Sequence, residues 1–574
     1  MTAIVDDRAA GARRARSLES GLALAVVALV TALAHFLLVG GFGLYEDDLF
    51  LIGSPLAHPN GAYLFEQLDR FVSWPEGRPL HGYVAAVLTI VASRLGGIAG
   101  LWWLAWGILV ANAWLFQRLL RRRLPGRMAL LAALFLTLAP SDTARPMMHV
   151  VYVVQASLTF VLVAALLHGR GRTTLACVLA VIALLTYETF FPLYVLAPVF
   201  ARDERMRSRR AWLRHLATVA ACLAFVLAAR VLTREARVLT TLAPTALGGT
   251  LATLAGHLVA GPALGLGLSI YRPLRELANA DATYAVVVVA VAAVCATALV
   301  MQQWLEDHAP GAPDADVRGP DIATMRERLT LGGALLVLGY VLSFTRPIGL
   351  TEGRMSTVHS AGTLGLAVIV ATLLDRALAS AATQRARRGA LVGVSLYLGL
   401  LAGPQLLVQQ DYVRDWSLAA RFWTRALVLL ADLGPNTQVV VERDGLSLGR
   451  FAYPHHRADD RVFKHLCGFG DEWEDLNRWI EVDRGWTEGL RWVDGSAELP
   501  DAPFFKPMPG AGPNLALPNG DVIVLTSRDG EWFRREEPIA VGEHVLALKP
   551  LEPNARGICG DGVLRPWLAR AKPG

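Results

Sequence analysis

Near its start the chain carries an uncharged apolar run of 23 residues, 21–43. About 20 apolar residues in a helix cross the hydrocarbon core of a bilayer, so this run predicts a membrane-spanning helix. It is too long for the core of a signal peptide and no cleavage site with a soluble stretch follows, so we expect it to be retained. Three consecutive carboxylates, Glu46, Asp47 and Asp48, come directly after it. At the end of a span, carboxylates stay in water beside the lipid headgroups and avoid most of the cost of burial in hydrocarbon.

The composition also indicates a membrane protein, because 54% of the 574 residues are hydrophobic and only 18% are charged. A soluble chain carries about a quarter charged residues. Residues 1–408 hold 35 Lys and Arg against 24 Asp and Glu, whereas residues 409–574 hold 20 against 25. The arginines form short clusters between apolar runs, which is typical of topology signals and not of nucleic-acid binding. We therefore predict a membrane body, an acidic soluble tail and no nucleic-acid partner.

The positive-inside rule places the N-terminus in the cytoplasm, because arginines cluster ahead of the first helix. The run 80–92 is too short to cross and is predicted to be re-entrant or to lie in the outer interface. The apolar but Gly-rich segment 251–270 is predicted to stay at the outer interface. With these two segments left out, the basic loops fall on the cytoplasmic side. The predicted spans, about eleven, are 21–43, 101–115, 128–140, 150–167, 173–186, 190–200, 216–229, 284–301, 329–344, 361–374 and 391–407.

The fold class predicted is an all-α polytopic membrane domain over residues 21–408, after a cytoplasmic tail, 1–20. An extracytoplasmic α/β domain follows over residues 409–574. It is predicted from an amphipathic helix after Val408 and from strand-like runs at 438–442, 522–526 and 545–548.

The cysteines divide between the two predicted domains. Cys467 and Cys559 lie in the tail, where an oxidising compartment permits a disulfide, and two unpaired thiols are an equal alternative. Cys177, Cys222 and Cys295 lie in apolar spans, and we expect them to be small core residues.

Four outward-facing segments carry the polar residues that a membrane body does not need. Acids beside arginines on one face indicate chemistry on an anionic lipid. Each also has a structural alternative: a helix end in solvent, an interfacial anchor, a local ion pair or a satisfied histidine. The candidates are Glu46, Asp47, Asp48, Arg78 and His81 in the first segment, Asp142, Arg145 and His149 in the second, Tyr187 and Glu188 in the third, and Arg346, Glu352, Arg354 and His359 in the last.

The order of these features resembles the polytopic GT-C glycosyltransferases, in particular the protein O-mannosyltransferase and aminoarabinose-transferase-like branch. The resemblance covers approximately residues 20–430. It rests on Asp47-Asp48-Leu49-Phe50 after the first helix, Gly77-Arg78-Pro79-Leu80 opening a short helix, a basic turn after the next span, and Tyr187-Glu188. The chain lacks the aromatic-rich surroundings of the acidic pair in protein O-mannosyltransferases, which argues against a protein acceptor.

The resemblance implies transfer of a sugar from a polyprenyl-phosphate donor to a glycan or glycolipid, with inversion at the anomeric carbon. Asp47 would be the base that takes the acceptor hydroxyl proton, with Asp48 or Glu46 orienting it or raising its pKa by repulsion. Arg346 and Arg354 would bind the phosphate, because a guanidinium grips it with two hydrogen bonds. The remaining candidates of the outer segments would contact substrate.

No cofactor is predicted with certainty. A divalent cation stays open, because some relatives use one and three adjacent carboxylates could hold it, although no closed ligand set is evident. The dominance of arginine over four lysines, together with the absence of eukaryotic sorting signals, predicts a bacterial inner-membrane protein acting on the outer face. The alternatives are a lipid-linked oligosaccharide polymerase, ligase or flippase, or a membrane protein that binds glycan without catalysis.

Overall fold

The computed structural model describes residues 2–72, 78–201, 203–233, 235, 239, 243, 245–308, 322–343, 348–349, 351–434, 437–442, 460–467, 479–483, 485–500, 515–528, 530–551, 562–568 and 570. By packing, the chain forms two compact units. The first comprises Met1–Val39 and Asn60–Gln409, and the second comprises Gly40–Pro59 and Gln410–Gly574. The domain division predicted from the sequence stays a prediction, but the short segment that carries the three carboxylates packs with the second unit.

The first unit is helical throughout its described residues. Its elements, where η marks a 3₁₀ or π turn, are α1 (Thr2–His35), α4 (Gly61–Val72), α5 (His81–Leu120), α6 (Gly126–Leu138), η2 (Val150–Gln155), α7 (Ala156–His168), α8 (Thr173–Thr186), η3 (Glu188–Phe200), η4 (Glu204–Arg207), α9 (Arg209–Leu232), α11 (Leu247–Glu276), η5 (Leu277–Asn279), α12 (Ala282–Asp307), α13 (Ile322–Leu338), η6 (Gly353–His359), α14 (Gly362–Ala379) and the first part of α15 (Gln384–Leu429).

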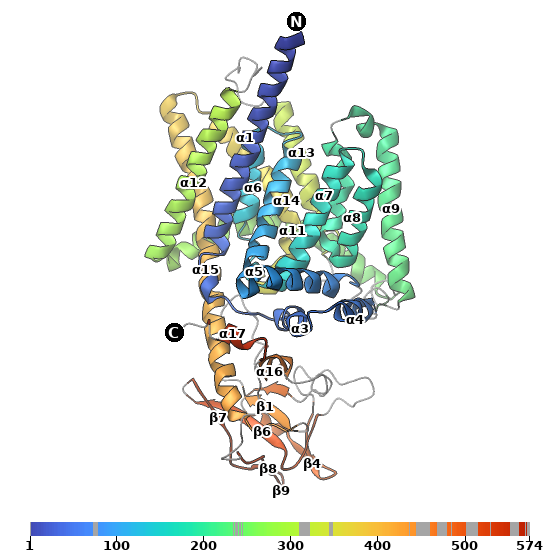
Figure 1. The fold of residues 1–574 in the computed structure, drawn as a ribbon, viewed down its shortest axis with the longest axis vertical. Helices are drawn as coiled ribbons and strands as arrows, with labels where there is room; N and C mark the ends of the chain where they lie inside the picture. Colours follow the sequence, from blue (N-terminus) through green and yellow to red (C-terminus); the bar gives the residue numbers. More distant parts are fainter. Residues whose placement is uncertain are drawn as a thin grey trace. The chain divides into compact units, whose positions relative to one another are not determined.

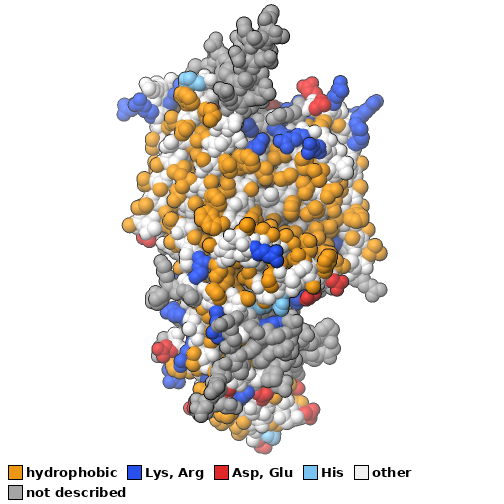
Figure 2. All heavy atoms as spheres, in the orientation of Figure 1, with side chains coloured by type: hydrophobic (Ala, Val, Ile, Leu, Met, Phe, Trp, Pro, Cys, Tyr) orange, Lys and Arg blue, Asp and Glu red, His pale blue; other side chains and the backbone are white. Residues whose placement is uncertain are grey.

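Eight helices of the described part are long and apolar enough to cross a membrane. Each of the predicted spans falls largely on a helix, although α6, α8, η3 and α13 are shorter than 18 residues. Figure 2 shows an apolar band across the visible face of this unit, with basic side chains gathered at the end that holds the N-terminus in Figure 1. The arrangement is that of a multi-pass membrane protein, while the number of spans stays a prediction.

Helix α5 is broken near its middle. Gly96 and Gly97 leave helical geometry, and Gly97 has a φ of +57°, which glycine adopts without steric cost. The part of α5 before the break runs across the bundle, and the part after it runs along the other helices (Figure 1). The sequence predicted this division, because it separated an interface-lying segment, 80–92, from a span at 101–115.

Helix α11 is long enough to cross a bilayer, by length and composition. The end of α9 and the start of α12, however, lie at the same end of the bundle, opposite the N-terminus (Figure 1). Helix α11 connects these two points, so it begins and ends on one side. This arrangement agrees with the predicted outer interface segment, 251–270.

The second unit contains a mixed α/β fold. Strand β1 (Gln438–Glu442) pairs in parallel with β2 (Trp479–Val482) and β6 (Val522–Arg528), and β6 pairs antiparallel with β7 (Glu531–Arg534). The other elements are α2 (Asp48–Leu51), α3 (Gly53–Ala57), the end of α15, α16 (Asp460–Cys467), η9 (Trp486–Gly489), the antiparallel strands β3 (Arg491–Val493), β4 (Ser496–Leu499) and β5 (Leu515–Leu517), the hairpin β8 (Ile539–Val541) with β9 (His544–Leu546), and α17 (Arg565–Leu568).

Apolar side chains alternate inward from these strands and form one core, which includes Val440, Ile480, Val524 and Leu546. Cys467, at the end of α16, is disulfide-bonded. Cys559 lies outside the described residues. Of the two alternatives for Cys467, the structure therefore has the disulfide.

Candidate functional site

The three consecutive carboxylates lie in a tight turn within the second unit. The Asp48 amide donates to the Tyr45 carbonyl at 2.9 Å, and Oδ2 of Asp48 accepts from the Tyr45 amide at 3.1 Å. Glu46, between them, has a φ of +50°, which is uncommon for a residue other than glycine. This turn sends the carboxylates into different surroundings: Asp48 is fully buried and Glu46 is 5% exposed, whereas Asp47 is half-buried.

Asp47 occupies the position that precedes α2, but its carboxylate makes no capping hydrogen bond to that helix. An aspartate at this position commonly accepts from the amides of the first helical turn. Asp47 is thus the carboxylate of the three that is both reachable from solvent and not committed to the helix end.

Tyr45 anchors the turn to α15. Its hydroxyl donates to the Tyr412 carbonyl at 2.8 Å, and the two rings meet edge to face at 4.8 Å. The chain approaches α15 closely here, because a Cβ placed on Gly43 would lie 1.7 Å from Cδ2 of Trp416. Only glycine fits at this approach, so the sequence of the segment and of α15 together fix where the turn begins.

Two further carboxylates from α15, Asp411 and Asp415, act on the same tyrosine. Burial raises the pKa of the Tyr45 hydroxyl well above its ordinary value, and the charges of Asp415, Asp48 and Asp411 raise it further, although the hydrogen bond from Gly43 opposes them. Tyr45 therefore remains a neutral hydrogen-bond donor. Asp411 and Asp415 were not predicted from the sequence, because they are spaced four apart on a long helix, where acids are ordinarily solvated.

The carboxylates of this turn do not amount to a metal site in the described residues. No group of three or more His, Cys, Asp or Glu side chains among them is placed to hold a metal ion. The predicted divalent cation stays untested.

Arg78 and Glu188 form a buried ion pair in the first unit. Nε and Nη2 of Arg78 donate to the two carboxylate oxygens of Glu188 at 2.9 and 2.7 Å. The guanidinium also lies over the Tyr187 ring, 4.3 Å from its centre, and Nη2 of Arg230 lies 3.5 Å from Glu188. Arg78 and Glu188 were predicted as separate substrate contacts, and the structure brings them together. Arg230, in α9, was not predicted.

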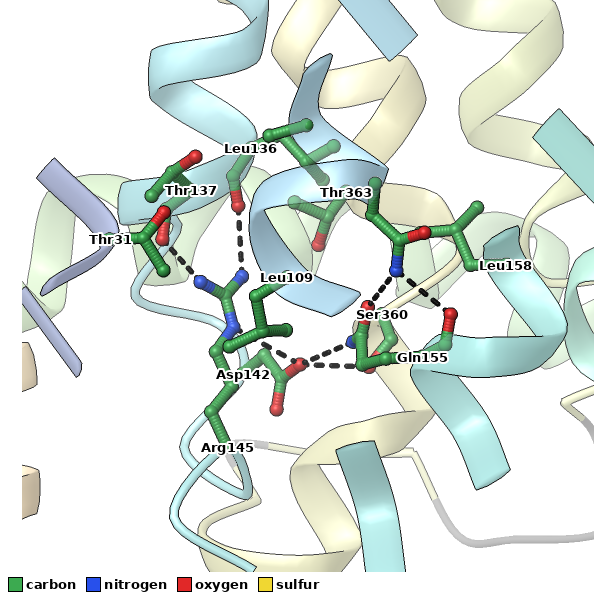
Figure 3. A pocket seen from close by; sticks show the side chains of 12 residues that line it. Thr31, Leu109, Leu136, Thr137, Asp142, Arg145, Gln155, Leu158, Ser360 and Thr363 are labelled. Carbon is green, nitrogen blue, oxygen red and sulfur yellow. Dashed lines mark hydrogen bonds and ion pairs between the residues drawn. The ribbon is translucent and has the colours of Figure 1, made fainter. Parts of the chain in front are cut away.

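Asp142 and Arg145 form a second buried pair, with Nε of Arg145 3.6 Å from Asp142 Oδ2 (Figure 3). The guanidinium donates to the main-chain carbonyls of Leu136, at 2.8 Å, and Thr137. These carbonyls belong to the last turn of α6, where they have no partner within the helix. Arg145 therefore closes the end of α6, and burial lowers its pKa although Asp142 raises it.

A small cavity adjoins this pair. Its water-accessible volume is about 20 Å³, which is room for about one water molecule. Polar atoms of Asp142, Gln155 and Ser360 border it (Figure 3), and Asp142 Oδ2 accepts from Ser360 at 3.2 Å. This cavity suits an internal water and is too small for a sugar.

The second and last outer segments are joined by hydrogen bonds, as expected for segments on one face. The Gly353 amide donates to Thr143 Oγ1 at 2.8 Å, and the Thr143 amide donates to Ser356 Oγ at 2.9 Å. Gly353 has a φ of +57°, so the loop turns where glycine permits it.

Two arginines at the end of α11 meet this joined loop. Nη2 of Arg272 donates to the Thr351 carbonyl at 2.7 Å, and Nη2 of Arg275 donates to Glu352 at 3.0 Å. Arg272 is 2% exposed, whereas the Arg275 side chain is 31% exposed. Burial raises the pKa of Glu352 although both arginines lower it in part. The sequence pointed to α11 only as an interface segment, and it did not single out these arginines.

Of the other predicted residues, all but Arg346 are among those that the structure describes. Arg354 is half-buried in η6, and Arg346 lies outside the described residues. His359 is fully buried, with Nδ1 2.8 Å from the Tyr340 hydroxyl and Nε2 3.0 Å from the Gly349 carbonyl. His149 is buried just before η2, and the ring centre of His81 lies 6.5 Å from that of Tyr187.

No protein-family model matches the chain, and no curated protein matches it in sequence. Among solved structures, the chain is similar to ArnT from Cupriavidus metallidurans bound to undecaprenyl phosphate. The sequence identity is 14%, the TM-score is 0.33, and the match covers 82% of this chain and 86% of that one. A likeness at this identity and TM-score identifies neither the family of the chain nor its activity.

Proposed function

We propose that the chain is a GT-C-like membrane glycosyltransferase of the bacterial inner membrane. It takes a sugar from a polyprenyl-phosphate donor and transfers it to an envelope glycan or glycolipid on the outer face. The acceptor oxygen attacks the anomeric carbon, the bond from that carbon to the phosphate oxygen breaks, and the configuration inverts. Such a reaction needs a base for the acceptor proton and cations for the departing phosphate.

The observation that carries the proposal is the separation of the three carboxylates by their turn. Asp48 and Glu46 are buried, while Asp47 is half-buried and does not cap α2. A general base has to reach the proton of a substrate, so it has to be accessible. Asp47 is the most accessible of the three carboxylates and is the proposed base.

Cations for the phosphate are proposed from the last outer loop and α11. Arg354 and Arg346 keep the role suggested by the resemblance. Arg275, in α11, is a third candidate. Its guanidinium is partly exposed and contacts the last outer loop, with Nη2 3.0 Å from Glu352. Arg78 has a different proposed role, since it is buried, at 5% exposed, and donates to both carboxylate oxygens of Glu188. It positions the segment that opens α5.

The experiment is transfer of radiolabelled sugar from a panel of polyprenyl-phosphate donors by the purified full-length protein in lipid nanodiscs, with lipid extracts of bacterial envelopes as acceptors. The proposal expects at least one donor to yield a labelled product with inverted anomeric configuration and to release polyprenyl phosphate. Binding of the donors without release of polyprenyl phosphate would instead favour a glycan-binding protein or a flippase.

A further inference from the structure

Two thiols in the first unit lie against each other. Sγ of Cys177, in α8, is 3.2 Å from Sγ of Cys222, in α9. Cys222 is buried and Cys177 is half-buried, and neither is in a disulfide. The sequence predicted both as small core residues, and their separation of 45 positions gave no sign that they meet.

The distance between the two sulfurs is not far from the length of a disulfide bond. A disulfide has an S–S length of about 2.05 Å, so the two sulfurs need to approach by only about 1.2 Å. Both helices also pack against η3. The third cysteine of the spans, Cys295, is buried in α12 and serves as an internal comparison, because no sulfur partner is recorded for it among the described residues.

We propose that Cys177 and Cys222 are an oxidation site, which forms a reversible disulfide between α8 and α9. With a peroxide as oxidant, one thiol is oxidised to a sulfenic acid and the peroxide is reduced. The second sulfur then attacks the first, the S–S bond forms, and the hydroxyl group leaves as water. A dithiol reductant reverses the step by exchange, since its own sulfurs become the disulfide.

The link would act on a helix that is otherwise lightly held. Only 22% of the most apolar 18-residue stretch of α9 is buried inside the protein, compared with 78% of the corresponding stretch of the helix that contains α7. Helix α9 also carries Arg230, which lies 3.5 Å from Glu188, and Glu188 follows directly after α8 and Tyr187. A bond between α8 and α9 therefore ties α9, which carries Arg230, to the helix that ends two residues before Glu188.

The test treats the full-length protein in membranes with hydrogen peroxide or with diamide, blocks the remaining thiols by alkylation, and digests it for mass spectrometry. With diamide, one thiol adds across the N=N bond and the second displaces the resulting hydrazine, so the same disulfide forms. We expect a linked peptide pair that contains Cys177 and Cys222, and we expect dithiothreitol to abolish it. Two fewer thiols per chain should then react with the alkylating agent.

Cys222→Ser removes the link, whereas Cys295→Ser is the matched control and leaves the link at its wild-type yield. The wild-type measurement stands without any variant, so a misfolded variant does not decide the outcome. The inference is overturned if Cys177 and Cys222 are both fully alkylated after treatment with the membrane-permeant oxidant copper phenanthroline. It is equally overturned if the linked peptides pair either cysteine with Cys295.

Discussion

Arg78 and Glu188 stand 110 positions apart in the sequence and share two hydrogen bonds, 2.7 and 2.9 Å long, in the interior of the helical unit. The pair fixes the entry to α5 against the turn between α8 and η3, since Arg78 comes three residues before α5 and Glu188 begins η3. Each residue is less than a tenth exposed. The interaction is therefore screened little by solvent.

Glu188→Gln should destabilise the protein strongly. The amide keeps the shape of the side chain, but it removes the negative charge that faces Arg78 and Arg230, and breaking one side of a buried pair costs about 3–5 kcal/mol. The measurement is the unfolding midpoint of the detergent-solubilised protein. Glu204→Gln is the control, because Glu204 is 93% exposed and lies 3.8 Å from Arg207. Equal midpoints for the two variants would show that the buried pair contributes no more than a surface pair.

Stability should fall as the pH is lowered below about 6.5, through His359. Burial lowers the pKa of its imidazole and Arg272 lowers it further, although the hydrogen bond to the Gly349 carbonyl opposes both. Because the folded pKa lies below the unfolded value of 6.5, the unfolded chain binds the proton first. The stabilisation is thus present above that value and is lost as the pH falls through the folded pKa.

The hydrogen bonds of His359 give the structural reason. A carbonyl can only accept, so Nε2 carries the hydrogen toward Gly349 and Nδ1 accepts from Tyr340. A proton on Nδ1 would occupy the lone pair that accepts from the Tyr340 hydroxyl, so that hydroxyl could no longer donate to the ring. Melting temperatures between pH 8 and pH 5 should fall less steeply for His359→Gln than for the wild type, while His308→Gln, at an exposed position, should follow the wild type. An unchanged slope in His359→Gln would contradict the assignment.

Gly43→Ala should disturb the acidic turn. Its Cβ would lie 1.7 Å from the Trp416 ring, so the backbone of the turn or the indole has to move. Overpacking of this kind costs about 1–3 kcal/mol. Gly40→Ala is the matched control, since a Cβ there meets no atom within 4 Å. We expect lower thermal stability and lower sugar transfer for Gly43→Ala alone, and matching values for the two alanine variants would show that this close approach is not needed.

The helical framework could be predicted because its physics is local. Apolar runs and arginine clusters lie within short windows, so the apolar helices and the break in α5 follow from length and charge. The pairing of Arg78 with Glu188 could not be predicted, since it depends on which spans pack together. Both residues were selected from the sequence as polar candidates, but their pairing with each other was not predicted.

The candidate site shows the same limit. The three carboxylates were visible as a motif, but only the turn, with Glu46 at positive φ, separates the accessible Asp47 from the buried Asp48. Arg275 was missed because an arginine near the end of an apolar helix is most often an interfacial anchor. Its contact with Glu352, 77 positions away, depends on how the helices and loops pack in the tertiary structure.

The most direct test compares sugar transfer and donor binding by the wild type, Asp47→Asn and the control Glu66→Gln, which changes an exposed acid on α4. Loss of a general base lowers a rate by about 10²–10⁴-fold. We expect that loss of transfer in Asp47→Asn with unchanged donor affinity, and wild-type behaviour in Glu66→Gln. Transfer by Asp47→Asn at the wild-type rate would contradict the assignment of the base and, with it, the account of the acidic turn.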